Sequence, residues 1–146
     1  MSEIKMYNAD EALLLQLPYA EQGVRAGFPS PAQDFFSESI DLNKEVIRHS
    51  ESTFYARAIG NSLCNAGVHE GDILVVDKSL EPKDGDMAVC CVEGEFTLKF
   101  IEIHKDYLLL CPANTEYQPI RILPEDDFSV WGIVTYIIHK VNNLHR

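Results

Sequence analysis

From about residue 50 onward, the chain is a series of apolar runs that are separated by glycine-containing turns. Runs rich in Val, Ile, Phe and Tyr, bounded by Gly and Asp, are typical of β-strands joined by tight turns. The runs occupy residues 54–58, 73–77, 87–92, 96–103, 107–111 and 128–141, and the turns occupy residues 70–72, 83–86 and 93–95. This series predicts a mostly β fold, a compact many-stranded β domain.

The first 50 residues lack this pattern and predict an extended, partly helical N-terminal arm. Asn8 and Asp41 each precede apolar residues with helical spacing and can cap a short helix. Ser30-Pro31 is a third helix start, because proline is favoured at the first helical position. Residues 22–30 have no helical period and contain two glycines and a proline. We therefore expect an exposed, extended stretch there, accessible to a protease cleft.

The charge balance argues against direct DNA binding. The 146 residues include 23 acidic and 12 basic side chains, which gives a formal net charge of −11. A protein that binds a duplex needs clustered Lys and Arg to neutralise phosphates, and the sequence has no such cluster. It also has no apolar run of roughly 18 residues that would span a membrane, and no targeting pattern at its start. These features predict a cytoplasmic protein without a membrane partner.

The sequence predicts neither a metal site nor a cofactor. It lacks paired C-x-x-C and H-E-x-x-H motifs, and its acidic turns do not complete a calcium loop. The cysteines are interpreted as reduced, mostly buried thiols of a cytoplasmic protein. They are Cys64, Cys90, Cys91 and Cys111.

Ser62 is the candidate nucleophile. It lies in Gly60-Asn61-Ser62-Leu63, directly after a predicted strand. A tight turn exposes the hydroxyl and leaves neighbouring N–H groups available to an oxyanion, an effect of roughly 2.7–4 kcal/mol per donor in other enzymes. An ordinary surface turn has the same composition, so the motif alone does not decide. Cys64 is an alternative nucleophile, but no histidine nearby suggests a Cys/His pair.

Lys99 is the candidate base. In the strand 96–103, alternation puts Phe96, Leu98 and Phe100 on one face and Lys99 with Ile101 on the other. A lysine that serves as a base near neutrality needs a pKa of roughly 7–8 instead of about 10.4, which costs about 4 kcal/mol. Burial beside apolar side chains supplies such a shift. The other reading is a solvent-facing strand lysine.

These residues, in this order and spacing, resemble the self-cleaving serine/lysine proteases of the LexA/UmuD type. The resemblance covers almost the whole chain. It implies that Ser62 is the nucleophile, that Lys99 is the general base and that the Ala26–Gly27 bond is the one cleaved. Its densest stretches are residues 27–32, 40–43, 60–63, 71–77, 94–99 and 131–134.

The resemblance also implies a biological role, in the SOS response to DNA damage. Residues 1–26 would be an arm that self-cleavage removes, residues 27–50 a residual arm with short helices, and residues 51–146 the protease-fold β domain. The RecA filament on single-stranded DNA would stimulate the cut. The trimmed form would be a homodimer that joins the catalytic, UmuC-like subunit of an error-prone translesion DNA polymerase.

Three positions depart from the usual pattern of this family. Asn61 stands where an aspartate is frequent, Leu63 replaces a methionine of similar volume, and Phe100 stands where relatives often carry a second basic residue. Two alternatives stay open: a regulatory binding module that no longer cleaves, and a phage-type repressor relative. The repressor needs a DNA-reading domain, and the acidic first 50 residues show no recognition-helix cluster. A membrane signal peptidase with the same chemistry would need an anchor.

Overall fold

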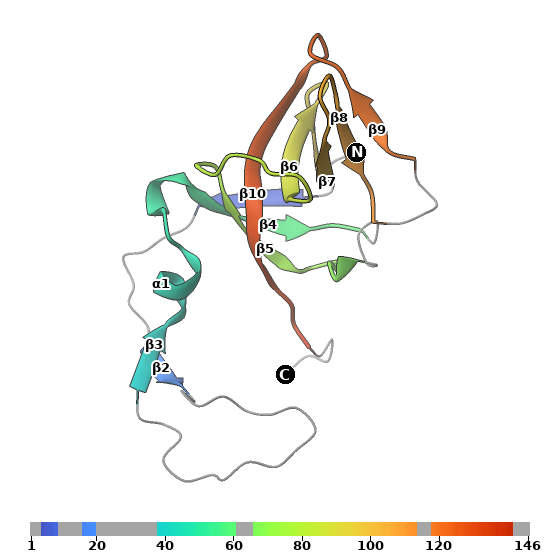
Figure 1. Ribbon diagram of the computed structural model, residues 1–146. Coiled ribbons are helices and arrows are strands. Elements are labelled where there is room, and N and C mark those ends of the chain that lie inside the picture. The colour runs from blue at the N-terminus through green and yellow to red at the C-terminus, as the bar shows by residue number, and fades with distance from the viewer. Residues whose placement is uncertain (1–3, 9–15, 20–37, 61–65, 114–117, 142–146) are drawn as a thin grey trace, which may run out of the picture.

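The computed structural model describes residues 4–8, 16–19, 38–60, 66–113 and 118–141, and the β domain that it shows confirms the predicted fold class (Figure 1). Eight strands form one sheet in the order β1-β4-β5-β10-β6-β7-β8-β9, and every neighbouring pair is antiparallel. The strands are β1 (Ile4–Asn8), β4 (Thr53–Ala58), β5 (Ile73–Asp77), β6 (Met87–Val92), β7 (Glu95–Ile103), β8 (Leu108–Cys111), β9 (Ile120–Ile122) and β10 (Phe128–Ile138).

Strand β10 holds the two halves of the sheet together. Its first half pairs with β6 and its second half pairs with β5. The register shifts twice along it, between Val130 and Gly132 and between Val134 and Tyr136. Such irregularities bend a strand and increase its twist. The curved ribbon of β10 in Figure 1 therefore serves both halves of the sheet.

The sheet has a core on each of its faces. The first cluster collects side chains from β4, β5, β6 and β7, and Ala56, Leu74 and Val89 in it are fully buried. The second cluster lies under β6–β10 and includes Ala88 and Cys90. Neighbouring residues of β6 thus alternate between the two clusters, as the two-residue period of a strand requires. Strand β1 also contacts β7, so the sheet curls round the first cluster.

The N-terminal region contains strands that the sequence pattern did not predict. Strand β2 (Gln16–Tyr19) pairs with β3 (Glu38–Asp41), and β1 pairs with β4. The predicted helix start at Ser30-Pro31 and the extended stretch 22–30 lie outside the described residues, as do residues 9–15 after Asn8. These strands gain their backbone hydrogen bonds from partners distant in sequence, which local periodicity does not reveal.

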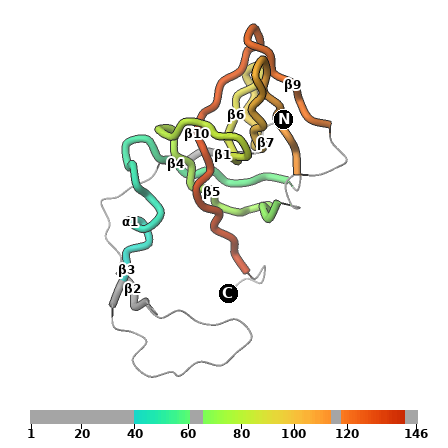
Figure 2. The backbone as a smooth tube through the Cα atoms, viewed as in Figure 1, coloured from blue at the N-terminus to red at the C-terminus, as the bar shows by residue number. Residues whose placement is uncertain are grey.

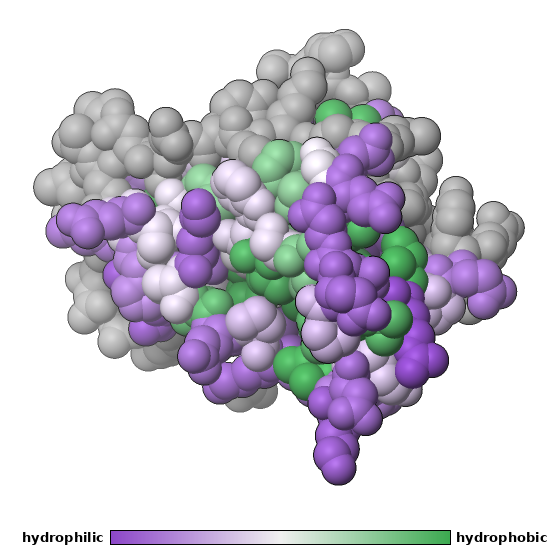
Figure 3. Space-filling view, turned by 90° about the horizontal axis from the view of Figure 1, so that it is seen from above, coloured by the Kyte–Doolittle hydropathy of each residue, from purple (hydrophilic) through white to green (hydrophobic). Residues whose placement is uncertain are grey.

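The short helix predicted after Asp41 is confirmed. Helix α1 (Leu42–Val46) begins where the Asp41 carboxylate accepts a hydrogen bond from the Asn43 N–H at 3.0 Å. Val46 and Ile47 pack on Val75 of β5, which ties this segment to the large sheet. A single 3₁₀ turn, Ser50–Ser52, then leads into β4. Figure 2 shows α1 extending away from the sheet, and Figure 3 shows apolar patches interrupted by hydrophilic side chains on the upper face.

We predict that Gly132→Ala destabilises the fold by about 1–3 kcal/mol, the usual cost of overpacking a core. A Cβ at this position would lie 2.6 Å from Val76 Cγ1 and 3.2 Å from the Asp77 carbonyl oxygen, and Val76 is fully buried. Urea denaturation followed by the fluorescence of Trp131, the single tryptophan, measures the change. Ser129→Ala on an exposed position of the same strand is the control, and equal midpoints for the two variants would contradict the prediction.

Candidate active site

The residues that lead to Ser62 follow the sequence prediction of a strand and then a glycine. Strand β4 ends at Ala58, and Gly60 follows with a φ of +85°, in the left-handed region that favours glycine. Ser62, Cys64 and the rest of residues 61–65 lie outside the described residues. The chain is described again from Ala66, and Val68 is buried in the first core cluster.

Backbone hydrogen bonds hold together the two ends of the segment between Ala58 and Gly71, which we call the serine loop because it contains Ser62. The Gly71 N–H donates to the Ala58 carbonyl at 2.8 Å, and the Ala58 N–H donates to the Asp72 carbonyl at 2.9 Å. The loop between Ala58 and Gly71 therefore leaves and re-enters the sheet at one place.

Lys99 lies in β7, opposite Ala88 of β6, and its side chain is half-buried. It shares a strand face with Ile101, which is 1% exposed in the second cluster. Its neighbour Leu98 points the other way, into the same first cluster as Ala58 and Val68. The base of the serine loop and the segment of β7 that carries Lys99 are thus held by one core. The alternation predicted for this strand is confirmed, whereas the catalytic role of Lys99 remains a prediction.

The predicted scissile bond, Ala26–Gly27, also lies outside the described residues. Its place in the chain is nevertheless informative. It falls between Tyr19, the last residue of β2, and Glu38, the first residue of β3, and these two strands pair with each other. A cut there would break the covalent connection between β2 and β3, which would remain linked by their backbone hydrogen bonds.

The described cysteines are poor candidates for a nucleophile. Burial raises the pKa of the Cys90 thiol to about 12, although the nearby Lys99 amine acts in the opposite direction. Burial, together with the hydrogen bond to Glu102, also raises the pKa of Cys111. A thiol must lose its proton to become a nucleophile. Cys90, Cys91 and Cys111 are free; Cys90 is buried, whereas Cys91 and Cys111 are half-buried, so burial is less general than the sequence interpretation expected.

A serine, a histidine and an aspartate that resemble a catalytic triad come together elsewhere in the structure. His49 Nδ1 lies 2.6 Å from Asp77 Oδ2 and 3.2 Å from the Ser79 hydroxyl. In a triad the carboxylate and the serine use different ring nitrogens, whereas here both lie at Nδ1. The Ser79 hydroxyl also donates to Asp77 at 2.7 Å. This cluster therefore fastens the segment before β4 to the end of β5 and does not activate a nucleophile.

A second buried carboxylate, Asp72, contacts His69 of the serine loop and His139, the residue after β10. It is 2% exposed, accepts a hydrogen bond from the His69 N–H at 2.8 Å, and lies 2.6 Å from His139 Nδ1. His139 comes just after β10, so this carboxylate joins the end of β10 to the segment that follows Ser62. Sequence reasoning missed this contact, because the two residues are 67 positions apart. The Gly71-Asp72 turn before an apolar strand was the only sequence signal.

No metal centre is built from these groups. Within the ranges that the structure describes, no set of three His, Cys, Asp or Glu side chains lies close enough to hold a metal ion. Among the same residues, none of the helices has the length and apolarity needed to cross a bilayer.

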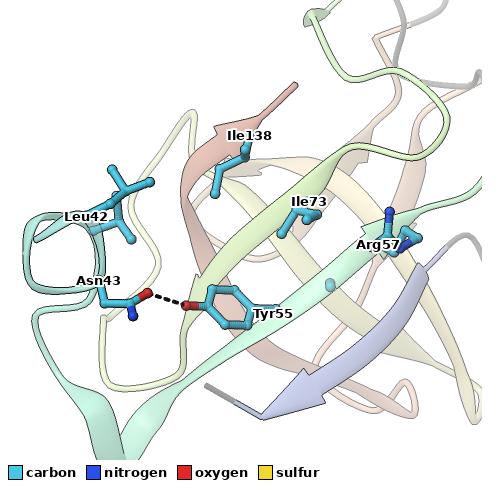
Figure 4. Close-up of a pocket in the computed structure, with 8 residues that line it drawn as sticks. Leu42, Asn43, Tyr55, Arg57, Ile73 and Ile138 are labelled. Carbon is cyan, nitrogen blue, oxygen red and sulfur yellow. Dashed lines mark hydrogen bonds between the residues drawn. The ribbon is translucent and has the colours of Figure 1, made fainter. Parts of the chain in front are cut away.

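An apolar groove of about 240 Å³ lies between α1 and the sheet (Figure 4). The Tyr55 hydroxyl donates to Asn43 Oδ1 at 3.4 Å across it. Among the described residues that line it, Arg57 is the only charged one. The groove therefore suits contact with apolar groups rather than catalysis. Its lining is Leu42, Asn43, Val46, Tyr55, Ala56, Arg57, Ile73 and Ile138.

Comparison with known proteins identifies the family. Residues 18–135 match the model of the Peptidase S24-like family. The chain belongs to this family. It is 42% identical over 118 residues to the protein SamA of Salmonella typhimurium, which covers 81% of each chain. It is 35% identical to MucA of Escherichia coli over 82% of each chain.

A LexA repressor is a more distant relative. The LexA repressor of Stenotrophomonas maltophilia is 31% identical to this chain, and the match covers 82% of this chain but 56% of the repressor. The resemblance to LexA/UmuD-type proteases that the sequence suggested is therefore confirmed. Membership of this family makes the chain a serine-peptidase relative by descent, and the roles of single residues are proposals.

We predict that His139→Ala speeds amide hydrogen exchange in residues 66–72 about tenfold, because Asp72 loses a partner worth about 1.4 kcal/mol. His139→Asn retains a side-chain N–H and should restore most of the protection. Exchange measured by mass spectrometry on peptic fragments tests both variants. His104→Ala is the control, since its partner Glu102 is exposed. Unchanged exchange in His139→Ala would show that the contact does not support the loop.

We predict that Asp77→Asn removes about 2 kcal/mol of stability above pH 5 and much less near pH 2. Burial opposes ionisation of Asp77, but hydrogen bonds from His49, Ser79 and Ser52 outweigh it and lower its pKa from 3.8 to about 2. A depressed carboxyl pKa stabilises the folded state above the ordinary value, and this contribution disappears as the pH falls from 3.8 to 2.

Urea denaturation between pH 2 and 7 measures this difference. The exposed Asp106→Asn serves as the control, with a change within about 0.5 kcal/mol at every pH. A penalty for Asp77→Asn that stays constant with pH would show that shape rather than charge is lost.

Proposed function

We propose that this protein is a self-cleaving serine endopeptidase that cuts its own Ala26–Gly27 bond through Ser62 and Lys99. The observation that carries the proposal is the family match, because residues 18–135 contain the bond, the serine and the lysine together. The glycine turn after β4 and the half-buried position of Lys99 are consistent with these roles.

The reaction proceeds in two steps. The neutral Lys99 amine accepts the Ser62 hydroxyl proton while the oxygen bonds to the Ala26 carbonyl carbon. The Ala26–Gly27 bond then breaks, and the Gly27 nitrogen leaves with the proton that Lys99 returns. Water, deprotonated by the same amine, attacks the resulting ester and releases the Ala26 carboxylate and the Ser62 hydroxyl. No metal or cofactor takes part.

Restraint of this reaction is part of the proposal. A cleavage site on the same assembly as its nucleophile has a high effective concentration, up to about 10⁵–10⁸ M in well-oriented systems. The uncut form persists only if the site is mostly undocked, so an activator must favour the docked arrangement. We propose that the RecA filament on single-stranded DNA is this activator, formed after DNA damage.

The trimmed form, residues 27–146, is proposed to act in SOS mutagenesis. The relatives SamA and MucA, which match this chain over most of their length, support this reading over that of a repressor. The product would be a cytoplasmic homodimer that serves as accessory subunit to a UmuC-like translesion polymerase. The domain division follows: residues 1–26 released, 27–50 a residual arm, and 51–146 the β domain.

A binding module that has kept the fold without cleavage is the second candidate. Asn61 and Leu63 favour it, because they alter the usual surroundings of the serine. The test below separates the two.

We predict that purified protein cuts itself after residue 26 on incubation at alkaline pH, without an activator. The rate should rise up to about tenfold per pH unit while the base is mostly protonated. Ser62→Ala and Lys99→Ala should each slow the cut by at least about 100-fold. Lys99→Arg should also fail, because arginine keeps its proton. Intact-mass spectrometry identifies the fragments.

The exposed Lys83→Ala is the matched control and should cut at the wild-type rate. An uncut wild type with a normal denaturation curve would favour the binding module. A cut that persists in Ser62→Ala would assign the nucleophile elsewhere.

A further inference from the structure

The first strand of the arm covers an edge of the β domain. Strand β4 pairs with β5 on one side and with β1 on the other. The pairing with β1 is antiparallel over five residues, from Ile4 opposite Ala58 to Asn8 opposite Phe54. Among the described strands, β1 is the outermost one beside β4, and it also contacts β7.

The proposed cut detaches this cover from the β domain. Both β1 and β2 precede Ala26, whereas their partners β4 and β3 follow Gly27. After the cut, short strand pairings alone would hold the arm. When β1 leaves, the backbone N–H and C=O groups of β4 that face it lose their partners. An open edge of this kind pairs readily with another strand.

We propose that β1 masks the β4 edge in the uncut chain, and that self-cleavage opens this edge to an extended segment of a partner protein. The inference rests on the proposed cleavage at Ala26–Gly27. It adds the surface that cleavage exposes and the way in which a partner would bind it, by adding a strand to the sheet.

The side chains of β4 indicate what such a segment contains. Ala56 and Ala58 are 0% and 5% exposed and belong to the first core cluster. Residues directly opposite each other in an antiparallel pair share a face, so the segment needs apolar residues at the positions opposite these two. In the chain itself those positions are Met6 and Ile4.

The other face of the segment would lie beside the apolar groove. Tyr55 and Arg57 alternate with the alanines and line this groove together with Ile73 and Ile138. Figure 4 shows β1 running alongside β4, with Tyr55 and Arg57 labelled on the neighbouring strand. The partner segment therefore has apolar contacts available on both faces, in addition to its backbone hydrogen bonds.

Charge favours a different protein over a second copy of this chain. The first 26 residues hold four acidic and two basic side chains, which leaves 19 acidic and 10 basic residues in the trimmed form. At this edge a second copy brings net charge of the same sign, whereas a basic segment is attracted; the proposed homodimer would therefore use another surface. We infer an extended segment with apolar residues at alternate positions and basic residues around them.

The test compares uncut and cut protein with a defined probe. The probe is a fluorescein-labelled peptide with the sequence of residues 2–10, which matches the strand that β4 accepts. The cut form, dialysed free of its arm, should bind the probe at least tenfold more tightly than uncut Ser62→Ala. A peptide with proline at the position of Tyr7 is the matched control, since it lacks the N–H that lies opposite Tyr55 of β4.

Amide exchange locates the binding. The amides of Tyr55 and Arg57, which alternate with the Ala58 amide bonded to Asp72, should exchange at least tenfold faster after the cut and regain protection when the probe is added. Equal protection of β4 before and after the cut would overturn the proposal, and so would equal binding of the proline peptide. Protection that returns in the trimmed form alone as its concentration rises would assign the edge to a second copy, and would also overturn it.

A second variant separates this inference from the proposed function. A recognition sequence for a site-specific protease replaces residues 24–29 in the Ser62→Ala chain, and the added protease makes the cut. If β4 opens after this cut but wild-type protein never cuts itself, the inference stands and the self-cleavage proposal fails. If β4 stays protected after either cut, the inference fails whether or not self-cleavage occurs.

Discussion

Everything in the β domain depends on the way in which β10 pairs with two different strands. Its two register shifts let one strand of 11 residues follow β6 first and β5 afterwards. The shifts bend β10 and increase its twist between the two pairings. At the first shift, Gly132 allows the backbone to approach Val76 and Asp77. The bend thus determines where β4, β5, β6 and β7 lie with respect to one another, and with them the candidate site.

The candidate site depends on three parts of this framework. Strand β4 leads into the serine loop, the Gly71-Asp72 turn follows the loop, and β7 carries Lys99. Leu98, Ala58 and Val68 lie in one cluster, so movement of one supporting element disturbs the others. Two buried carboxylates, Asp72 and Asp77, anchor the two ends of β5. Burial opposes ionisation of Asp77, but hydrogen bonds from His49, Ser79 and Ser52 outweigh it and lower its pKa, which keeps this carboxylate charged.

The sequence predicted those parts of the structure that local chemistry determines. The strands 73–77 and 87–92 have the predicted bounds, because apolar runs ending in Asp, Gly or Glu leave few alternatives. Helix α1 follows from the Asp41 cap. Strands β1, β2, β3 and the three-residue β9 were missed, because each exists only through pairing with a distant segment. The Asp72–His139 contact was missed for the same reason. The roles of Ser62, Lys99 and the Ala26–Gly27 bond came from resemblance, and they stay predictions.

The pairing of β2 with β3 has a kinetic consequence for the arm. Residues 1–26 carry two strands, and each pairs with a different strand of the remaining chain. A fragment held at two points is bivalent: when one strand detaches, the other keeps it nearby at a local concentration on the order of millimolar, and rebinding competes with escape. Hydrolysis of the peptide bond is therefore followed by a delay before residues 1–26 dissociate from the rest of the chain. The length of that delay depends on how often both short pairings open together, and it would set the interval between the chemical event and the appearance of the released form.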